Sequence, residues 1–283
     1  MRILKISFAL SLSAIALTST YVAYSTWQTE ADIKAHRQNV IALAQQTEGP
    51  NWDNAALSTL PKVVQRYLQF SFPNGPTNIS HVSMEMEGQF RRPQTEGFAA
   101  TTAEQVVAAN TPALAFSATT PIIPGVWARA YDAYADVRME MKAKILSTIT
   151  VVDEKETPEL NATSLRRWLL ESPLYPVALM PGGPVTWEAI DDTRARATVT
   201  MSGYSASLVA TFREDGSLER FDAEEDGDLT SPYHGSGEHV YRTDYKEVSG
   251  MMIPHKFIIA RAAKGKILPF WNGHLTSITF SSL

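Results

Sequence analysis

The pattern of hydrophobic and polar residues changes its period near residue 78. Before that point, residues 31–46 and 59–72 carry apolar side chains at helical spacing, and Gly49 and Pro50 separate the two segments. After that point, apolar and polar side chains alternate, which is typical of strands with one buried face. The sequence therefore predicts two amphipathic helices followed by mainly β structure.

The alternation is clearest in residues 81–90 and 135–145, where an apolar side chain stands at every second position and charged residues stand between them. Further strand-like segments follow at residues 99–109, 113–119, 125–134, 185–190, 194–202, 206–213, 218–224, 238–247, 252–261 and 274–281. Short strands at intervals of about 8–12 residues are typical of an antiparallel meander.

One helix interrupts the strands. Asn161 can cap a helix over residues 162–172, in which Leu165, Trp168 and Leu169 form an apolar stripe. A proline-rich connection then leads back to strands. This order predicts a mainly β, α+β fold: an antiparallel meander that forms an open, incomplete β-barrel, with this helix over its concave side and further helices before it.

The amino terminus carries 24 residues without a charge, Ile6 to Thr29. This segment is either a cleaved signal peptide or a retained signal anchor. Ala23-Tyr24-Ser25 fits a cleavage site, but an apolar run of about 20 residues exceeds the usual signal core of roughly 7–15 residues. The length, and the aromatic residues near its end, favour retention.

The charges around this segment indicate its orientation. Arg2 and Lys5 precede it, whereas Glu30 and Asp32 follow it. The positive-inside rule then leaves the rest of the chain outside the cytoplasm. We expect residues 1–29 to be a signal anchor or signal peptide, 30–60 a helical linker and 61–283 the half-barrel domain. Residues 6–27 would hold the protein in a bacterial inner membrane, with the carboxy-terminal domain in the periplasm.

Composition excludes several classes of site. The chain has no cysteine, so a disulfide framework, a thiolate zinc site, an iron–sulfur cluster and a cysteine nucleophile are all excluded. Its net charge is −5, and no basic run is present, which argues against a nucleic-acid partner.

Candidate catalytic groups are few. Of six histidines, His234 and His239 lie closest together, in a glycine-rich segment with Glu238. A metal or hydrolase site here competes with a plain polar loop, because Glu238 and His239 are adjacent and would point apart on a strand. The acidic residues between 222 and 228 lack the register of a calcium loop. We assign no catalytic residue, no metal ligand and no cofactor.

The methionines suggest a ligand-binding wall. Methionine is flexible and polarizable, and it suits an apolar surface that adapts to varied partners. An ordinary core that uses methionine as filler is the alternative. The predicted apolar wall consists of Met84, Met86, Phe90, Met139, Met141, Trp168, Trp187 and Phe212.

Several segments together resemble a bacterial family of domains of unknown function, usually preceded by one membrane segment. The resemblance covers roughly residues 60–283 and assigns no activity. The residues that carry it are Tyr67-Leu68 after Pro61, Asp132-Ala-Tyr134, Leu165–Leu169 with Pro176 and Ala178-Leu179, Val185 to Asp192, Phe212 to Gly216, Tyr245 to Gly250 with Pro254, and Pro269-Phe-Trp271.

The strand–helix–strand layout is also similar to the incomplete β-barrel of periplasmic lipoprotein carriers and of mycobacterial lipid-binding lipoproteins, although this chain has no cysteine to lipidate. We expect a membrane-anchored, extracytoplasmic module that binds a lipid or another apolar small molecule. Two alternatives stay open: an envelope scaffold that binds a protein partner, and a hydrolase that acts on an apolar substrate.

Overall fold

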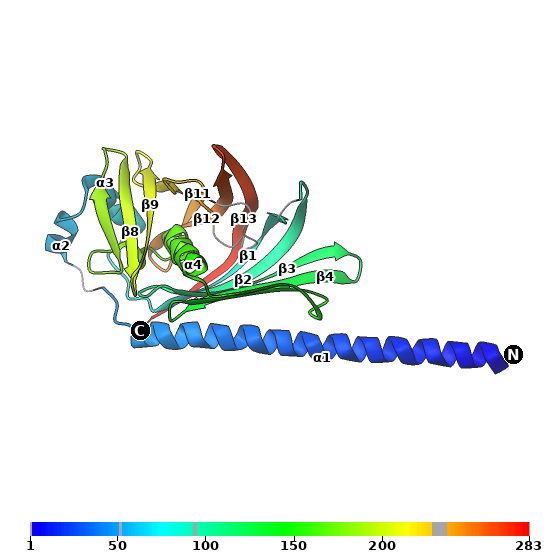
Figure 1. Cartoon of the computed structure of the whole chain (residues 1–283). Coiled ribbons are helices and arrows are strands. Elements are labelled where there is room, and N and C mark those ends of the chain that lie inside the picture. Colours follow the sequence, from blue (N-terminus) through cyan, green and yellow to red (C-terminus); the bar gives the residue numbers. More distant parts are fainter. Residues whose placement is uncertain (1, 51–52, 93–94, 228–236, 283) are drawn as a thin grey trace.

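The computed structural model describes residues 2–50, 53–92, 95–227 and 237–282. One antiparallel sheet dominates it (Figure 1). The described strands are β1 (His81–Arg91), β2 (Phe98–Ala108), β3 (Ala113–Ile123), β4 (Val126–Ala135), β5 (Arg138–Ile145), β6 (Ile149–Lys155), β7 (Val185–Ala189), β8 (Arg194–Met201), β9 (Tyr204–Phe212), β10 (Leu218–Asp222), β11 (His239–Val248), β12 (Met251–Ala263) and β13 (Lys266–Ser281). The described helices are α1 (Arg2–Gln46), α2 (Asn54–Ser58), α3 (Lys62–Ser71) and α4 (Pro158–Glu171), with short 3₁₀ turns at Ser172–Leu174 and Pro176–Leu179.

The first and last strands in the chain, β1 and β13, are neighbours at the centre of the sheet. Its strand order is β6-β5-β4-β3-β2-β1-β13-β12-β11-β10-β9-β8-β7. The chain therefore meanders from β1 to one edge, crosses to the opposite edge through α4, and meanders back to β13. Strands β1 and β13 pair from His81↔Ser281 to Phe90↔Trp271. The predicted fold class, an open antiparallel meander with a helix over its concave side, is confirmed.

Helix α4 is fixed to the sheet at both ends. Thr157 caps its first turn, since the Thr157 hydroxyl accepts a hydrogen bond from the amide of Leu160 at 3.2 Å. The side-chain oxygen of Asn161 accepts from the amide of Met139 on β5 at 3.0 Å. Near the other end, the indole of Trp168 donates to the carbonyl of Ala108 on β2 at 2.9 Å. These bonds hold the helix across the concave face.

Helix α3 covers one end of the half-barrel. The ring of Tyr67 packs against Phe212 at 5.4 Å, and the ring of Phe70 meets Tyr245 edge-on at 5.2 Å. Arg66 donates to the carbonyl of Asp192, in the turn between β7 and β8, at 2.7 Å. The opposite end of the sheet carries the hairpin turns between β1 and β2, β3 and β4, β5 and β6, and β12 and β13. We call it the hairpin end.

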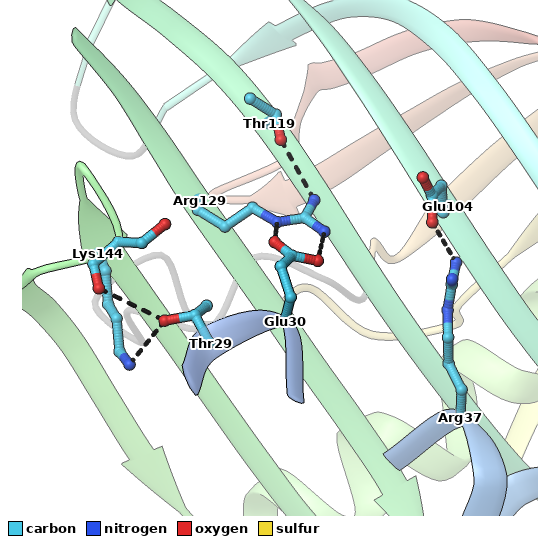
Figure 2. A network of polar contacts seen from close by, with 8 residues as sticks. Thr29, Glu30, Arg37, Glu104, Thr119, Arg129 and Lys144 are labelled. Atoms are coloured by element: carbon cyan, nitrogen blue, oxygen red, sulfur yellow. Dashed lines mark hydrogen bonds and ion pairs between the residues drawn. The ribbon is translucent and has the colours of Figure 1, made fainter. Parts of the chain in front are cut away.

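The second half of α1 packs on the convex face of the sheet. Val40 and Ala44 are fully buried there, against a surface of small side chains on β2, β3 and β4. Figure 2 shows the polar contacts along the same seam: Glu30 accepts two hydrogen bonds from Arg129, at 2.8 and 3.0 Å, and Arg37 pairs with Glu104 at 2.6 Å. This part of the helix is therefore an integral layer of the domain.

The first half of α1 projects beyond the hairpin end (Figure 1). Where the helix leaves the sheet, Thr29 donates to the carbonyl of Ser147 at 3.4 Å and accepts from Lys144 at 3.1 Å. Large apolar side chains before it are exposed, among them Leu17 at 72% and Trp27 at 66%. Within the part of the chain that the structure describes, no helix is both long and apolar enough to span a membrane.

Several local predictions need correction. Thr157 caps α4, and Asn161 instead holds β5. The strand predicted from residue 135 begins at Arg138, because Asp136 and Val137 take positive φ angles in the turn after β4. Edge strand β6 was not predicted: Ile149 and Val151 are both exposed, so neither face gives the usual alternation.

We predict that Val40→Asp releases the second half of α1 from the sheet, because the new carboxylate would be buried without a partner. Tryptic cleavage after Lys34 and Arg37 should then rise about tenfold or more, as expected for a locally opened segment. Mass spectrometry of the fragments measures this. The neighbouring residue Asn39 is exposed, and Asn39→Asp should leave cleavage unchanged. Equal protection of both variants would contradict this packing.

Candidate ligand-binding cavity

A row of small residues hollows the concave face. Ala103, Ala118 and Ala130 stand in register on β2, β3 and β4, and Ala103 also pairs with Met86 on β1. Paired residues of an antiparallel sheet point to the same face, so three adjacent methyl groups face α4 beside the methionine. At Ala118 and Ala130, the row leaves space under the helix that larger side chains would fill.

Two glycines at the centre of the sheet let its strands and the ring of Phe257 pack closely beside the cavity. Gly88 on β1 pairs with Gly273 on β13, and Gly273 pairs with Phe257 on β12. A Cβ atom at Gly88 would overlap the carbonyl of Asn272, and one at Gly273 would lie 2.6 Å from the ring of Phe257. Only glycine allows this close approach of strands and ring.

The resulting cavity lies between the sheet and the carboxy-terminal half of α4 and has a volume of about 90 Å³. Its apolar part is mainly aromatic: the Phe90 ring meets Trp271 and Phe270 edge-on, and Trp271 packs against Phe257 at 5.8 Å. The remaining lining residues are Met86, Thr101, Gln105, Phe116, Ala118, Thr120, Ala130, Asp132, Met141, Arg167, Glu171, Leu174, Arg242 and Ile259.

Charged residues form the end of the cavity next to α4. Arg167 donates to Asp132 on β4 at 2.8 Å and to Glu171, one turn later on α4, at 2.9 Å. Gln105 on β2 donates to the other oxygen of Glu171. All four side chains are buried. The ring of Phe116 lies under the Arg167 guanidinium, 4.8 Å from its central carbon.

Two opposing effects act on the pKa of Asp132 at this end of the cavity. Burial raises the pKa of Asp132, because a charged carboxylate loses its hydration, and the adjacent Arg167 opposes that rise. Arg167 therefore stabilises two buried carboxylates at once. A neutral side chain in its place would leave both without a cation.

A second buried cation lines the cavity. Arg242 on β11 is 1% exposed, and it pairs in register with Phe257, whose ring lies 5.6 Å from the guanidinium carbon. Its Nη2 donates to the carbonyl of Leu170 at 3.3 Å. Burial lowers the pKa of Arg242.

The residues predicted as an apolar wall divide into two groups. Met86, Phe90 and Met141 line the cavity. Met84, Met139, Trp168 and Phe212 are buried in the core, and Trp187 packs against that core and donates its indole N–H to the carbonyl of Leu179 at 3.1 Å. These five residues do not line the cavity.

Sequence reasoning did not single out the charged residues of the cavity, although a signal was present. Asp132 shares the phase of Ala130 and Tyr134 along β4, and Arg242 shares the phase of Val240 along β11. A charge at a position that alternation assigns to the buried face indicates either a partner or a ligand.

The two described members of the candidate histidine segment, Glu238 and His239, have separate partners. His234 and Asp228 lie outside the described residues. Glu238 is fully buried and pairs with Arg166 at 2.9 Å and Arg261 at 3.0 Å. The neighbouring His239 instead meets Asp222 at 2.7 Å. Among the described residues, no group of acidic and histidine side chains could hold a metal ion.

A comparison with protein families matches residues 58–280 to a family of unknown function, DUF6920. The match covers most of the chain and the whole sheet. The chain belongs to this family. The resemblance seen in the sequence is thereby confirmed, and DUF6920 itself carries no assigned activity. No curated protein matches the sequence.

Solved structures similar to this DUF6920 chain include a LolA superfamily protein from Nitrosomonas europaea, with 9% identity and a TM-score of 0.39 over 78% of this chain and 93% of that chain. A domain assigned to outer membrane lipoprotein sorting, from Vibrio parahaemolyticus, has 6% identity and a TM-score of 0.35 over 79% and 93%. Both come from the carrier class that the sequence layout resembles. Likenesses of this extent support no inference about function. The cavity itself is the feature of this chain that bears on function.

We predict that Arg167→Met destabilises the DUF6920 domain by about 3–5 kcal/mol, because it leaves two buried carboxylates without their cation. Chemical denaturation of the purified variant measures the loss. Adding Asp132→Asn and Glu171→Gln should restore much of the stability.

Arg196 provides the matched control for this prediction. It also binds two carboxylates, Glu188 and Glu224, but on the surface, where water screens the charges. Arg196→Met should leave the denaturation midpoint nearly unchanged. Similar losses for Arg167→Met and Arg196→Met would contradict the buried network.

Proposed function

We propose that this protein is a membrane-anchored, extracytoplasmic module that binds the apolar chain of a lipid, or a similar apolar ligand, in the cavity under α4. The observation that carries the proposal is the pair of alanines, Ala118 and Ala130, that lines the cavity beneath the helix. An ordinary core fills such a place with side chains, because empty space forfeits packing contacts. Here small residues keep it open, and aromatic residues border it.

The dimensions favour one narrow chain. Pockets for whole small molecules usually measure about 300–1,000 Å³, whereas this cavity has about 90 Å³. Such a space takes only the first carbons of one alkyl chain, and a longer chain requires the lining side chains to move. Methionines at two lining positions, Met86 and Met141, can adjust their rotamers to chains of different length.

The hairpin end supports the membrane part of the proposal. The first half of α1, which carries no charge after Lys5, projects from this end (Figure 1). Exposed apolar side chains gather on the same rim: Phe98, Ile122, Ile123, Ile149 and Ile267. An apolar rim beside an apolar helix suits contact with a lipid surface. A ligand that leaves the membrane would then have a short path to the cavity.

We expect protein purified from membranes to carry an alkyl-chain ligand, which mass spectrometry after organic extraction detects. Each buried CH₂ contributes about 0.8 kcal/mol, so retention through purification should rise with the length of chain that the cavity takes in. Ala118→Trp fills the hollow and should lower the bound amount about fivefold or more.

The control for this experiment is Ala100→Trp, which adds the same side chain to an exposed position of β2. It should keep the ligand. An empty wild-type cavity, or equal ligand content in both variants, would contradict binding at this site.

We also expect residues 6–27 to hold the protein in the membrane with its domain outside the cytoplasm. Fractionation of cells should place the full chain with the inner membrane. Protease added to cells whose outer membrane has been opened should digest the domain, although the inner membrane stays sealed. A soluble mature protein that begins near Thr26 would contradict anchoring. A carboxy terminus inside the cytoplasm would contradict the orientation.

A further inference from the structure

Arg242 differs from the other buried cations of the domain in its partners. Arg167 meets two carboxylates, and Arg261 meets Glu238 at 3.0 Å. Among the described residues, no carboxylate oxygen lies within 4.0 Å of the Arg242 guanidinium. The guanidinium donates to the Leu170 carbonyl at 3.3 Å and lies against the ring of Phe257. Its Nε, although buried, has no partner in the described structure.

A buried arginine of this kind destabilises the fold unless a further group supplies hydrogen bonds and a counter-charge. An ionised group removed from water needs a counter-charge and hydrogen bonds, and a guanidinium offers five N–H donors in a planar fork. The nearby carboxylate of Glu171 is already engaged by Arg167 and Gln105. The donors of Arg242 therefore remain available at a wall of the cavity.

We propose that Arg242 receives the anionic head group of a single-chain amphiphile, a carboxylate or a phosphate monoester, while the first carbons of the alkyl chain occupy the aromatic part of the cavity. This inference rests on the proposed function and specifies the ligand class for the same site. A planar fork with free donors suits a carboxylate in particular, because two parallel N–H···O bonds can form.

The arrangement of lining residues orients such a ligand. Arg242 and Phe257 stand in one register row, and Trp271 and Phe90 stand in the next row toward the hairpin end. The head group would lie beside α4, close to Leu170. The chain would pass over Phe257 and Trp271 toward Phe90, where the sheet ends in its hairpin turns.

The test compares ligands of equal chain length that differ in charge. Full-length protein, delipidated and held in a fluorinated surfactant that does not enter alkyl pockets, is titrated with hexadecanoic acid, hexadecyl phosphate and hexadecan-1-ol, and native mass spectrometry measures occupancy. We expect at least one anionic ligand to bind about tenfold or more tightly than the alcohol, since hydrogen bonds to charged groups discriminate to this extent. The tighter of the two anionic ligands identifies the head group.

Variants at position 242 then show whether Arg242 causes the preference for the anion over the alcohol. Arg242→Met should reduce binding of the preferred anion to that of the alcohol and leave the alcohol unchanged, whereas Arg242→Lys should keep part of the preference. Arg194 is a surface arginine that pairs with Asp191, and Arg194→Met should have no effect on either ligand.

The outcomes separate this inference from the function on which it rests. Equal binding of acid, phosphate and alcohol by the wild-type protein overturns the role of Arg242 but leaves a cavity for apolar chains. An anion preference that survives in Arg242→Met overturns it as well. Failure of all three ligands to bind overturns the proposed function itself. Where Arg242→Met does not fold, the wild-type preference and Arg242→Lys still decide the question.

Discussion

The structure depends on one topological constraint: consecutive strands β6 and β7 lie at opposite edges of the same sheet. The chain between them has to cross the full width of the sheet. It does so on the concave face, as α4 and the two 3₁₀ turns that follow. The crossing segment therefore provides the cover that an open sheet lacks, and no closure of strands into a barrel is needed to bury the concave face.

The cavity follows from how this crossing is packed. Helix α4 packs most closely on β8 and β9, and its residues Leu165, Trp168 and Leu169 belong to the continuous core. On the side of β2 to β4, the same helix faces alanines, and it sends charged side chains, Arg167 and Glu171, toward the sheet. Core and cavity are thus two parts of the interface between α4 and the sheet. The size of the side chains on the sheet determines which part is filled and which stays open.

Much of the architecture could be predicted from the sequence. Alternation in residues 81–90 gave the correct buried face of β1, and a single helix between two runs of strands implied its place over an open sheet. Strand β6 was missed because an edge strand with exposed apolar residues has no one-sided pattern. The caps of α4 were misassigned because Asn161 and Thr157 both suit the role, and only the position of β5 decides between them.

The site was harder to predict for a physical reason. Methionine and aromatic residues line cores and cavities alike, so residue type separates Met86 from Met84 or Met139 poorly. What distinguishes the cavity is the small side chains of Ala118 and Ala130, together with cross-strand register. Register joins residues that are far apart in the sequence, as in the row from Arg242 through Phe257 and Gly273 to Gly88, and single-strand periodicity contains no information about it.

The pairing of β1 with β13 at the centre of the sheet also sets the order in which the domain can form. A ribosome releases β1 to β6 first, as one continuous meander, and this half exposes the unpaired edge of β1 until the final strand of the chain emerges. An open edge of this length is a template for pairing with another chain. The pairing of β1 with β13 is thus the last to form. Until it forms, the charged residues Glu85 and Glu87 on β1 discourage pairing of the nascent chain with other chains.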